Sequence, residues 1–474
     1  MRRVGVTPSL EGLFVAAFAL LGVRLGATPI ADNSAFWHIR TGIDMVAGRG
    51  VPTADPYSWT AAGHPWVVQS WLAEGIYGAA HWLHGYEGIV VLNAMLLGSV
   101  AGLSAALARA GSPRRTLVAA GLATAVGVGW WSLRPLLFGL VLLGATIFVT
   151  LRSWRAWWLI PLGALWVNVH GSFVLGLAWL GLSGLGALFD RRDGAPQVRD
   201  DAARIGALAA GVAVGALISP VGWRLLTFPF GLLERREAFA AVIEWQRPDF
   251  FGGRVQAMAG LALLATAAVL VWRRPPLRVA LPAAAFIGAA LLSQRNMAPA
   301  GLAIAPALAA ALGPLAGGEV PAGREAELEE AAGEPAVESA VVNRAVASLL
   351  VVAGLFFLAA ASTQPALDLR DYPVAAVRWM EAQGLRQPGS RVVHTDVVGG
   401  WLILRDGRQA DVFIDDRVDM YPLEVQRDYL AMLRDQPQAL EALDRRQVDV
   451  VLWPADGELS ERLVRTAAWK KGFE

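Results

Sequence analysis

The chain has 474 residues, of which 55% are hydrophobic and only 17% are charged. A soluble domain carries about a quarter charged residues, so this composition excludes an ordinary soluble protein. The net charge of +1 provides no basic surface for nucleic acid, and a chain without cysteine has neither disulfides nor thiolate metal sites.

Long apolar runs predict about eleven membrane-spanning helices, because a helix satisfies every backbone polar group inside a bilayer. The runs cover residues 13–30, 88–108, 116–131, 135–151, 157–169, 173–189, 205–219, 255–272, 279–292, 298–315 and 345–361. No convincing cleavage site follows Met1-Arg2-Arg3, so we expect the first helix to be retained rather than removed as a signal peptide.

Arginines in alternate loops predict the orientation, because positive charge favours the cytoplasmic side. With a cytoplasmic N-terminus, the inside loops hold Arg109, Arg114, Arg115, Arg152, Arg155, Arg191, Arg192, Arg199, Arg204, Arg273, Arg274 and Arg278. The sequence thus predicts a transmembrane domain (1–362) with outer loops at 31–87 and 220–254, an acidic cytoplasmic linker (317–343) and an extracytoplasmic domain (363–474).

The outer side would then hold most of the chemistry. All six histidines fall there, namely His38, His64, His81, His84, His170 and His394. Polar residues in apolar surroundings at the ends of spans indicate a functional cavity that opens outward. Within the first outer loop, apolar spacing over 35–47 and 67–84 predicts two helices lying in the membrane interface.

The C-terminal domain alternates between two kinds of pattern. Helices are predicted over 374–383, 423–433 and 439–445, and strands over 391–394, 412–414 and 448–452. The fold class is therefore an α-helical polytopic membrane protein with a C-terminal soluble α/β domain. Its acid-rich loop, with Asp415, Asp416, Arg417 and Asp419, follows a strand end. That loop could bind a ligand, as strand ends do in α/β folds, or simply pack on the membrane domain.

A set of motifs is spread along nearly the whole chain. They are Asp32-x-x-x-Phe36-Trp37-His38, Pro52-Thr53-x-Asp55-Pro56-Tyr57-Ser58-Trp59-Thr60, Gly63-His64-Pro65-Trp66, Trp71-Leu72-x-Glu74, Leu133-Arg134-Pro135, Trp166-Val167-Asn168-Val169-His170-Gly171-Ser172-Phe173, Ser219-Pro220-x-Gly222-Trp223-Arg224, Glu244-Trp245-Gln246-x-Pro248-Asp249-Phe250, Arg295-Asn296 and Phe413-Ile414-Asp415-Asp416-Arg417-x-Asp419-x-Tyr421. In these motifs the chain resembles a large bacterial family of multispan proteins placed with the GT-C glycosyltransferases, which are related in architecture to oligosaccharyltransferases and protein mannosyltransferases.

The resemblance implies an inverting glycosyltransferase of the bacterial cytoplasmic (inner) membrane. Such enzymes transfer a sugar from a polyprenyl-phosphate carrier to an acceptor on the outer face, here a glycan, a lipid or a protein. The family places an acid just after the first span, so Asp32 is expected to accept the acceptor's proton or to bind a divalent cation, Mg²⁺ or Mn²⁺. Relatives often carry a second acid where this chain has Ser34, which argues against a two-carboxylate metal site; they also tend to carry Gln or His at Leu136.

Each candidate catalytic residue also has a structural interpretation. Asp32 could instead cap a helix or form a salt bridge with Arg40. Asp55, a second candidate, precedes a proline, and an Asx-turn is the favoured alternative. His38 could orient Asp32 or touch a phosphate, or it could be a packed interfacial histidine.

Contacts to the donor are expected from a second group of residues: Arg134, His170, Glu244, Trp245, Arg247, Arg295 and Asn296. An unpaired charge at a span end is costly unless it binds something, and phosphate would suit both Arg134 and Arg295. Snorkelling to lipid headgroups is the alternative for these arginines. The segment 244–247 could close over a sugar or cap the bundle. His81 and His84 share a helix face, but without a third ligand a solvated face is favoured over a metal site.

Two further function classes remain open. One is a transporter or flippase for a lipid or polysaccharide, although the spans show no mid-span charge and no obvious inverted repeat. The other is a non-catalytic envelope assembly protein that keeps the GT-C fold. In every case the expected partners are membrane lipids and lipid-linked sugars rather than nucleic acid.

Overall fold

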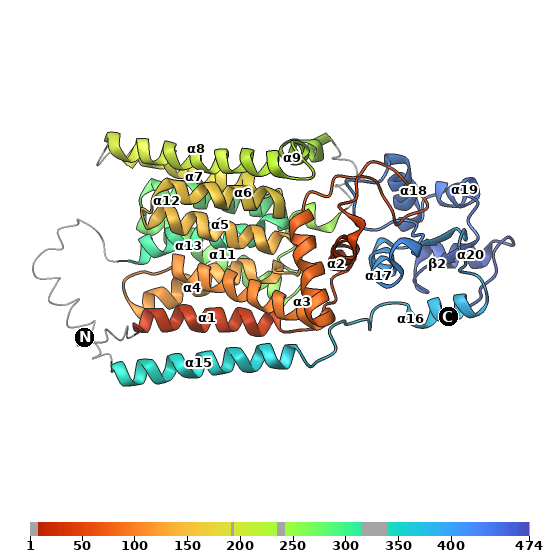
Figure 1. Cartoon of the computed structure of the whole chain (residues 1–474), viewed down its shortest axis with the longest axis horizontal. Coiled ribbons are helices and arrows are strands. Elements are labelled where there is room, and N and C mark those ends of the chain that lie inside the picture. The colour runs from red at the N-terminus through yellow and green to blue at the C-terminus, as the bar shows by residue number, and fades with distance from the viewer. Residues whose placement is uncertain (1–7, 191–193, 235–241, 314–338, 474) are drawn as a thin grey trace, which may run out of the picture.

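The computed structural model describes residues 8–190, 194–234, 242–313 and 339–473. Helices run side by side in a bundle, and the C-terminal part of the chain forms a second body at one end of it (Figure 1). The long bundle helices are α1 (Leu10–Gly26), α3 (Trp71–Leu107), α4 (Pro113–Gly127), α5 (Leu136–Leu151), α6 (Leu159–Val169), α7 (Phe173–Asp190), α8 (Gly194–Ile218), α11 (Arg254–Arg273), α12 (Leu277–Leu292), α13 (Met297–Leu312) and α15 (Ala340–Ala361). Every apolar run predicted from the sequence overlaps one of these helices.

The surface of the bundle is apolar where lipid would contact it. Within the described ranges, five helices are long and apolar enough to cross a membrane: α3, α7, the 199–218 part of α8, α11 and α15. α15 packs along the outside of the bundle and leaves Leu349, Leu355 and Phe356 exposed, the last by 66%. Such a surface is unfavourable in water and favourable in a bilayer. The protein is therefore a helical membrane protein.

Small residues bring the bundle helices close together. α13, which is rich in alanine, is buried along almost its whole length. Gly26 of α1 faces α3 so closely that a Cβ atom on it would lie 2.6 Å from the Cα of Ala94. Without a hydrophobic driving force between helices in lipid, such close backbone packing is a main source of helix association.

The segment predicted as the first outer loop, residues 31–87, lies at one end of the bundle (Figure 1), and it keeps that name below. It forms α2 (Asn33–Asp44), a π-helical turn η1 (Met45–Arg49) and an irregular segment that leads into α3. The helix predicted over 67–84 is confirmed in most of its length, because the first part of α3 begins at Trp71 and ends at His84 and Gly85. These two residues have non-helical backbone angles, with a φ of 60° at Gly85, and they separate this part from the long helix that follows. Glycine tolerates this left-handed conformation, so the chain changes direction there.

Shorter helices complete the turns at the two ends of the bundle. They are η2 (Val128–Trp130), η3 (Ala156–Trp158), α9 (Arg224–Glu234), η4 (Ile243–Trp245) and η5 (Gln294–Asn296). The acidic linker predicted at 317–343 lies, as far as residue 338, outside the described residues.

The C-terminal part contains a two-stranded parallel sheet surrounded by short helices. Strand β1 (Val392–His394) pairs with β2 (Val450–Leu452), with Val392 opposite Val450. The helices are α16 (Val374–Ala382), α17 (Asp396–Asp406), η6 (Gly407–Gln409), α18 (Leu423–Leu433), α19 (Gln438–Arg445) and α20 (Glu458–Arg465). The predicted helices at 374–383, 423–433 and 439–445 correspond to α16, α18 and α19, whereas α17 and α20 were not predicted.

The strand predicted over 412–414 is wrong. These three residues are buried, which explains the apolar pattern, but Val412 forms only an isolated bridge, and its partner is Ser58 of the first outer loop. Val412 N donates to Tyr57 O at 3.0 Å, and Trp59 N donates to Val412 O at 3.1 Å. The segment therefore joins the C-terminal part to the outer loop rather than extending the sheet.

A second backbone connection lies beside the end of α1. Ile30 N donates to Ala366 O at 2.8 Å, and Asp368 N donates to Ile30 O at 2.9 Å. Gly400 of α17 also approaches the start of α2, where a Cβ on it would lie 2.6 Å from Asn33 O. These contacts hold the C-terminal part against residues 30–60, directly above the turns that carry the candidate site.

Candidate functional site

The polar turns singled out from the sequence meet at the end of the bundle that faces the C-terminal part. Trp71 Nε1 donates to Asn168 Oδ1 at 2.8 Å, and Gly171 N donates to Gln69 Oε1 at 2.8 Å. On another side, Trp130 Nε1 donates to Gln294 Oε1 at 3.2 Å. Turns from four separate places in the sequence are therefore joined in two pairs at this end of the bundle.

Arg134 lies at this end of the bundle and forms ion pairs with acids from two other segments of the chain. Its Nε is 2.8 Å from Asp32 Oδ2 and its Nη2 is 3.0 Å from Asp32 Oδ1, a bidentate ion pair, while Nη1 contacts Glu244. The side chains of Asp32, Arg134 and Glu244 are 17%, 25% and 38% exposed, so solvent or a ligand can reach all three. We call Asp32, Arg134 and Glu244 the Arg134 cluster.

Asp32 also caps α2, because its Oδ1 accepts the backbone N–H of Ser34 at 2.9 Å. The capping alternative raised by the sequence is thus confirmed, but the partner of its ion pair is Arg134 and not Arg40. Arg40 instead pairs with Asp44 on its own helix, at 3.1 Å. The i,i+4 spacing on one helix explains that local preference.

Asp416 reaches the same region from the C-terminal part. Its Oδ2 accepts a hydrogen bond from the Ser34 hydroxyl, and its Oδ1 is buried with no hydrogen-bond partner among the described residues. Burial raises the pKa of Asp416 to about 7, against the opposing effects of Arg134 and Ser34. A carboxyl group with this pKa can hold or release a proton near neutral pH.

Arg295, in η5, is the other cation of the site. Its guanidinium lies 5.0 Å from the centre of the Trp245 ring and forms no ion pair or hydrogen bond with any residue that the structure describes. Burial, together with the nearby charge of Arg134, lowers the pKa of Arg295 to about 10, whereas Asp419 raises it. Its side chain is half-buried, and a partly desolvated arginine without an acid is costly, so this position favours a bound anion.

A buried histidine–carboxylate pair lies beneath the Arg134 cluster. His38 Nδ1 is 2.8 Å from Glu74 Oε1, and Glu74 Oε2 has no hydrogen-bond partner among the described residues. Burial first, and then Arg134, lower the pKa of His38 well below its ordinary value. The pair is held by close backbone contact one turn away, where a Cβ on Gly78 would lie 2.1 Å from Gly42 O.

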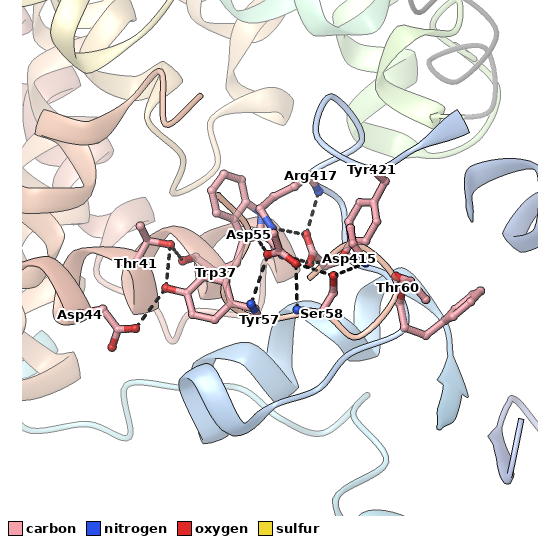
Figure 2. Close-up of polar contacts among 12 residues, drawn as sticks. Trp37, Thr41, Asp44, Asp55, Tyr57, Ser58, Thr60, Asp415, Arg417 and Tyr421 are labelled. Atoms are coloured by element: carbon pink, nitrogen blue, oxygen red, sulfur yellow. Dashed lines mark hydrogen bonds and ion pairs between the residues drawn. The ribbon is translucent and has the colours of Figure 1, made fainter. Parts of the chain in front are cut away.

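Arg417 forms a separate, fully buried cluster between the first outer loop and the C-terminal part (Figure 2). Its Nη1 is 2.8 Å from Asp55 Oδ1, and its Nη2 is 2.6 Å from Asp415 Oδ2, which also accepts the Tyr421 hydroxyl at 2.6 Å. The guanidinium lies within 6.0 Å of the ring centres of Trp37, Tyr57, Trp66 and Tyr421. We call Arg417, Asp55, Asp415 and Tyr421 the Arg417 cluster.

Asp55 shapes the loop as well as binding Arg417. Its Oδ1 accepts Tyr57 N at 3.2 Å and its Oδ2 accepts Ser58 N at 3.0 Å, and Figure 2 shows the carboxylate between this turn and Arg417. The Asx-turn favoured from the sequence is confirmed. Both oxygens of Asp55 are therefore occupied, so this residue supports the loop and the position of Asp416, the residue directly before Arg417.

The remaining predicted residues occupy different surroundings. His170 is buried, its Nδ1 accepts Ser172 N at 3.1 Å, and burial together with Arg295 lowers its pKa to about 3. Asn296 uses its side chain to donate to Ala289 O at 3.0 Å, which closes a helix turn. Arg247 is exposed and belongs to neither cluster. The structure thus brings together most of the residues predicted to contact the sugar donor, but it leaves Arg247 and Asn296 outside the site.

The surroundings of Asp32 suit a guanidinium rather than a divalent cation. Both carboxylate oxygens are already bound to Arg134, and one of them also accepts a backbone N–H. Across the described ranges, no group of three or more histidine, aspartate or glutamate side chains is placed to hold a metal ion. His81, of the predicted helix-face pair, packs its ring 4.7 Å from that of Tyr86.

Two contributors were missed by reasoning from the sequence. Glu74 appeared only as part of a motif, and Ser34 only as a missing acid, yet they bind His38 and Asp416 respectively. Only their positions in the sequence could have identified them as site residues. Ser34 lies two residues after Asp32, and Glu74 lies in the first turn of α3. The sequence matches no protein-family model and no curated protein, so the resemblance to GT-C glycosyltransferases depends on its motifs alone.

Proposed function

We propose that the protein is an inverting membrane glycosyltransferase that takes a sugar from a polyprenyl-phosphate donor and passes it to an acceptor on the outer face of the bacterial cytoplasmic membrane. The observation that carries this proposal is the half-buried Arg295, unpaired among the described residues, beside the Arg134 cluster. A phosphate between the two arginines would satisfy Arg295 and attract Arg134 as well. Trp245, whose ring lies against the Arg295 guanidinium, is an aromatic side chain of the kind on which sugars stack.

The reaction needs one base and one stabilised leaving group. The acceptor hydroxyl attacks the anomeric carbon, the carbon–oxygen bond to the phosphate breaks, and the phosphate leaves with the electron pair. Arg295 and Arg134 stabilise the negative charge that develops on that phosphate. The hydroxyl proton passes to a carboxylate, for which Asp32 is the proposed acceptor once the donor phosphate competes for Arg134.

The proposed topology places this chemistry outside the cell. Eleven spans from a cytoplasmic N-terminus would place residues 363–474, proposed as an α/β domain, on the extracytoplasmic side. Supporting this orientation, Arg109, Arg152 and Arg273 lie at helix ends opposite the candidate site, where cytoplasmic arginines are expected. The polar turns and the C-terminal part occupy the other end (Figure 1).

Binding and transfer can be tested separately. Purified protein in liposomes is given a radiolabelled polyprenyl-phosphate sugar, and both retained lipid and transferred sugar are measured. Arg295→Gln should weaken binding of the carrier by roughly tenfold or more, because a charge-assisted contact is lost. Asp32→Asn should abolish transfer while leaving binding within a few-fold. Arg247→Gln, at an exposed position outside both clusters, is the matched control for the loss of one arginine.

One observation favours a second class of function. Asp32 has no free oxygen in this arrangement, as expected for a structural ion pair in a non-catalytic envelope assembly protein or in a lipid or polysaccharide transporter. Carrier binding that depends on Arg295, together with no transfer by the wild-type protein from any donor, would support that class. Full turnover by Asp32→Asn would remove Asp32 from the mechanism.

A further inference from the structure

A cavity of about 490 Å³ lies at the end of the bundle opposite the candidate site. It is formed where α1 begins, where α3, α5 and α13 end, and where α12 begins. Most residues that line it are apolar, with Leu107, Phe148, Val279 and Pro306 among them, while polar atoms form about half of its accessible wall. This volume falls within the range of small-molecule sites, which are concave and largely apolar with a few polar groups.

Two arginines line this cavity, and the described residues offer neither an ion pair. Arg109 Nε is buried with no hydrogen-bond partner, and Arg152 is exposed and lies over the ring of Phe148, 5.3 Å from its centre. The acid in the lining is Glu11, whose Oε1 accepts the hydroxyl of Thr116 at 2.8 Å. Helix C-terminal dipoles favour arginines here but leave the buried N–H of Arg109 without an acceptor.

The surroundings place the cavity at the level of lipid headgroups. Trp154, Trp157 and Trp158 follow α5 and are each close to half exposed, and Trp154 packs edge-on against Phe148 of the cavity wall, with ring centres 5.8 Å apart. Exposed tryptophans of this kind mark the membrane–water interface. At the rim, Leu151 and Ala310 are exposed, so the apolar wall continues to the surface of the bundle.

From these contacts we infer that the cavity binds an anionic phospholipid, with its phosphate between Arg109 and Arg152 and the first part of an acyl chain along Phe148, Leu151 and Val279. Two cations facing one site repel each other unless an anion lies between them, and Glu11, engaged by Thr116, offsets only part of their charge. The apolar wall distinguishes a lipid from a free phosphate ion, which would gain nothing from it. This site is independent of the proposed transferase activity.

Lipid retention by the purified full-length protein tests the inference. The protein in detergent is titrated with dioleoylphosphatidylglycerol, and bound lipid is counted by native mass spectrometry. Arg109→Gln should lower the affinity for this lipid by about tenfold or more. Arg114→Gln, at an exposed position near the same bundle end and outside the cavity lining, should leave it unchanged.

Two further arms separate the lipid from its alternatives. Ala309→Leu places a larger side chain in the cavity without altering its charge, so it should also reduce binding of the lipid. It therefore tests the site even if the Arg109→Gln variant does not fold. Dioleoylphosphatidylcholine should bind at least several-fold more weakly than the anionic lipid. Equal binding of the two lipids, displacement by millimolar inorganic phosphate alone, or an Arg109→Gln affinity equal to that of Arg114→Gln would each overturn the inference.

Discussion

Arg134 holds both carboxylate oxygens of Asp32, with contacts of 2.8 and 3.0 Å, although the two residues are 102 positions apart in the chain. The ion pair joins the residue before α2 to the turn before α5. Glu244, from a third segment, contacts the remaining nitrogen. A planar guanidinium can serve two acids in fixed directions at once, which a lysine cannot do.

Replacing Arg134 with lysine should therefore separate charge from geometry. Arg134→Lys keeps one positive charge but cannot bridge both oxygens of Asp32 and still reach Glu244. We expect binding of a polyprenyl phosphate to weaken by roughly tenfold, measured by lipid retention in liposomes. Arg247→Lys is the control at an exposed position. Carrier affinity equal to that of the wild-type protein would show that the fork geometry of Arg134 is not used.

Removing the buried cation of the Arg417 cluster should destabilise the protein. Arg417→Met leaves Asp55 and Asp415 facing each other without a cation, and breaking a buried pair in this way costs about 3–5 kcal/mol. The apparent Tm, followed by tryptophan fluorescence, should fall clearly, whereas Arg434→Met at an exposed position should change it little. Adding Asp55→Asn to Arg417→Met should recover part of the loss. An unchanged Tm for Arg417→Met would contradict the role given to this cluster.

The contact between α2 and α3 can be tested with one methyl group. Gly78→Ala would place a Cβ 2.1 Å from Gly42 O, so the helices must move apart and the His38–Glu74 pair must lengthen. Overpacking of this kind costs about 1–3 kcal/mol. Gly75→Ala, on the same helix, meets only the flexible end of Met45 at 3.5 Å and is the control. If both variants unfold at the same temperature in a thermal melt, the helices are not held by this close contact.

Mild acid should weaken the C-terminal part through His394. Phe413 N donates to His394 Nε2 at 3.1 Å, and burial lowers the pKa of His394 to about 4, from an ordinary value of 6.5. Between these two values the unfolded chain binds a proton that the folded chain does not, so stability is complete above pH 6.5 and falls as the pH drops toward 4. The loss from this group is about 3 kcal/mol.

Chemical unfolding at pH 7.5 and pH 5 measures this effect. His394→Gln lacks the titrating group, so its stability should differ less between the two pH values than that of the wild-type protein. His81→Gln, at a less buried position on α3, is the matched control and should keep most of the wild-type pH dependence. A pH dependence for His394→Gln as steep as that of the wild-type protein would assign the effect to other groups.

Much of the local structure could be predicted from the sequence. The bundle helices follow from apolar runs, because only a helix satisfies its own backbone in lipid. The Asx-turn at Asp55 and the cap at Asp32 also follow from neighbouring residues, since both bind backbone N–H groups two or three positions away.

The tertiary structure alone decided which side chains meet. Asp32 pairs with Arg134 rather than with nearby Arg40, and Arg417 pairs with Asp55 across 362 positions. The apolar pattern at Val412 predicted a strand, but its partner is Ser58 of a distant loop. A local sequence pattern indicates how buried a residue is and which turn it can form. Which two distant side chains form a pair depends instead on how the helices pack, and that packing is determined by contacts over the whole bundle.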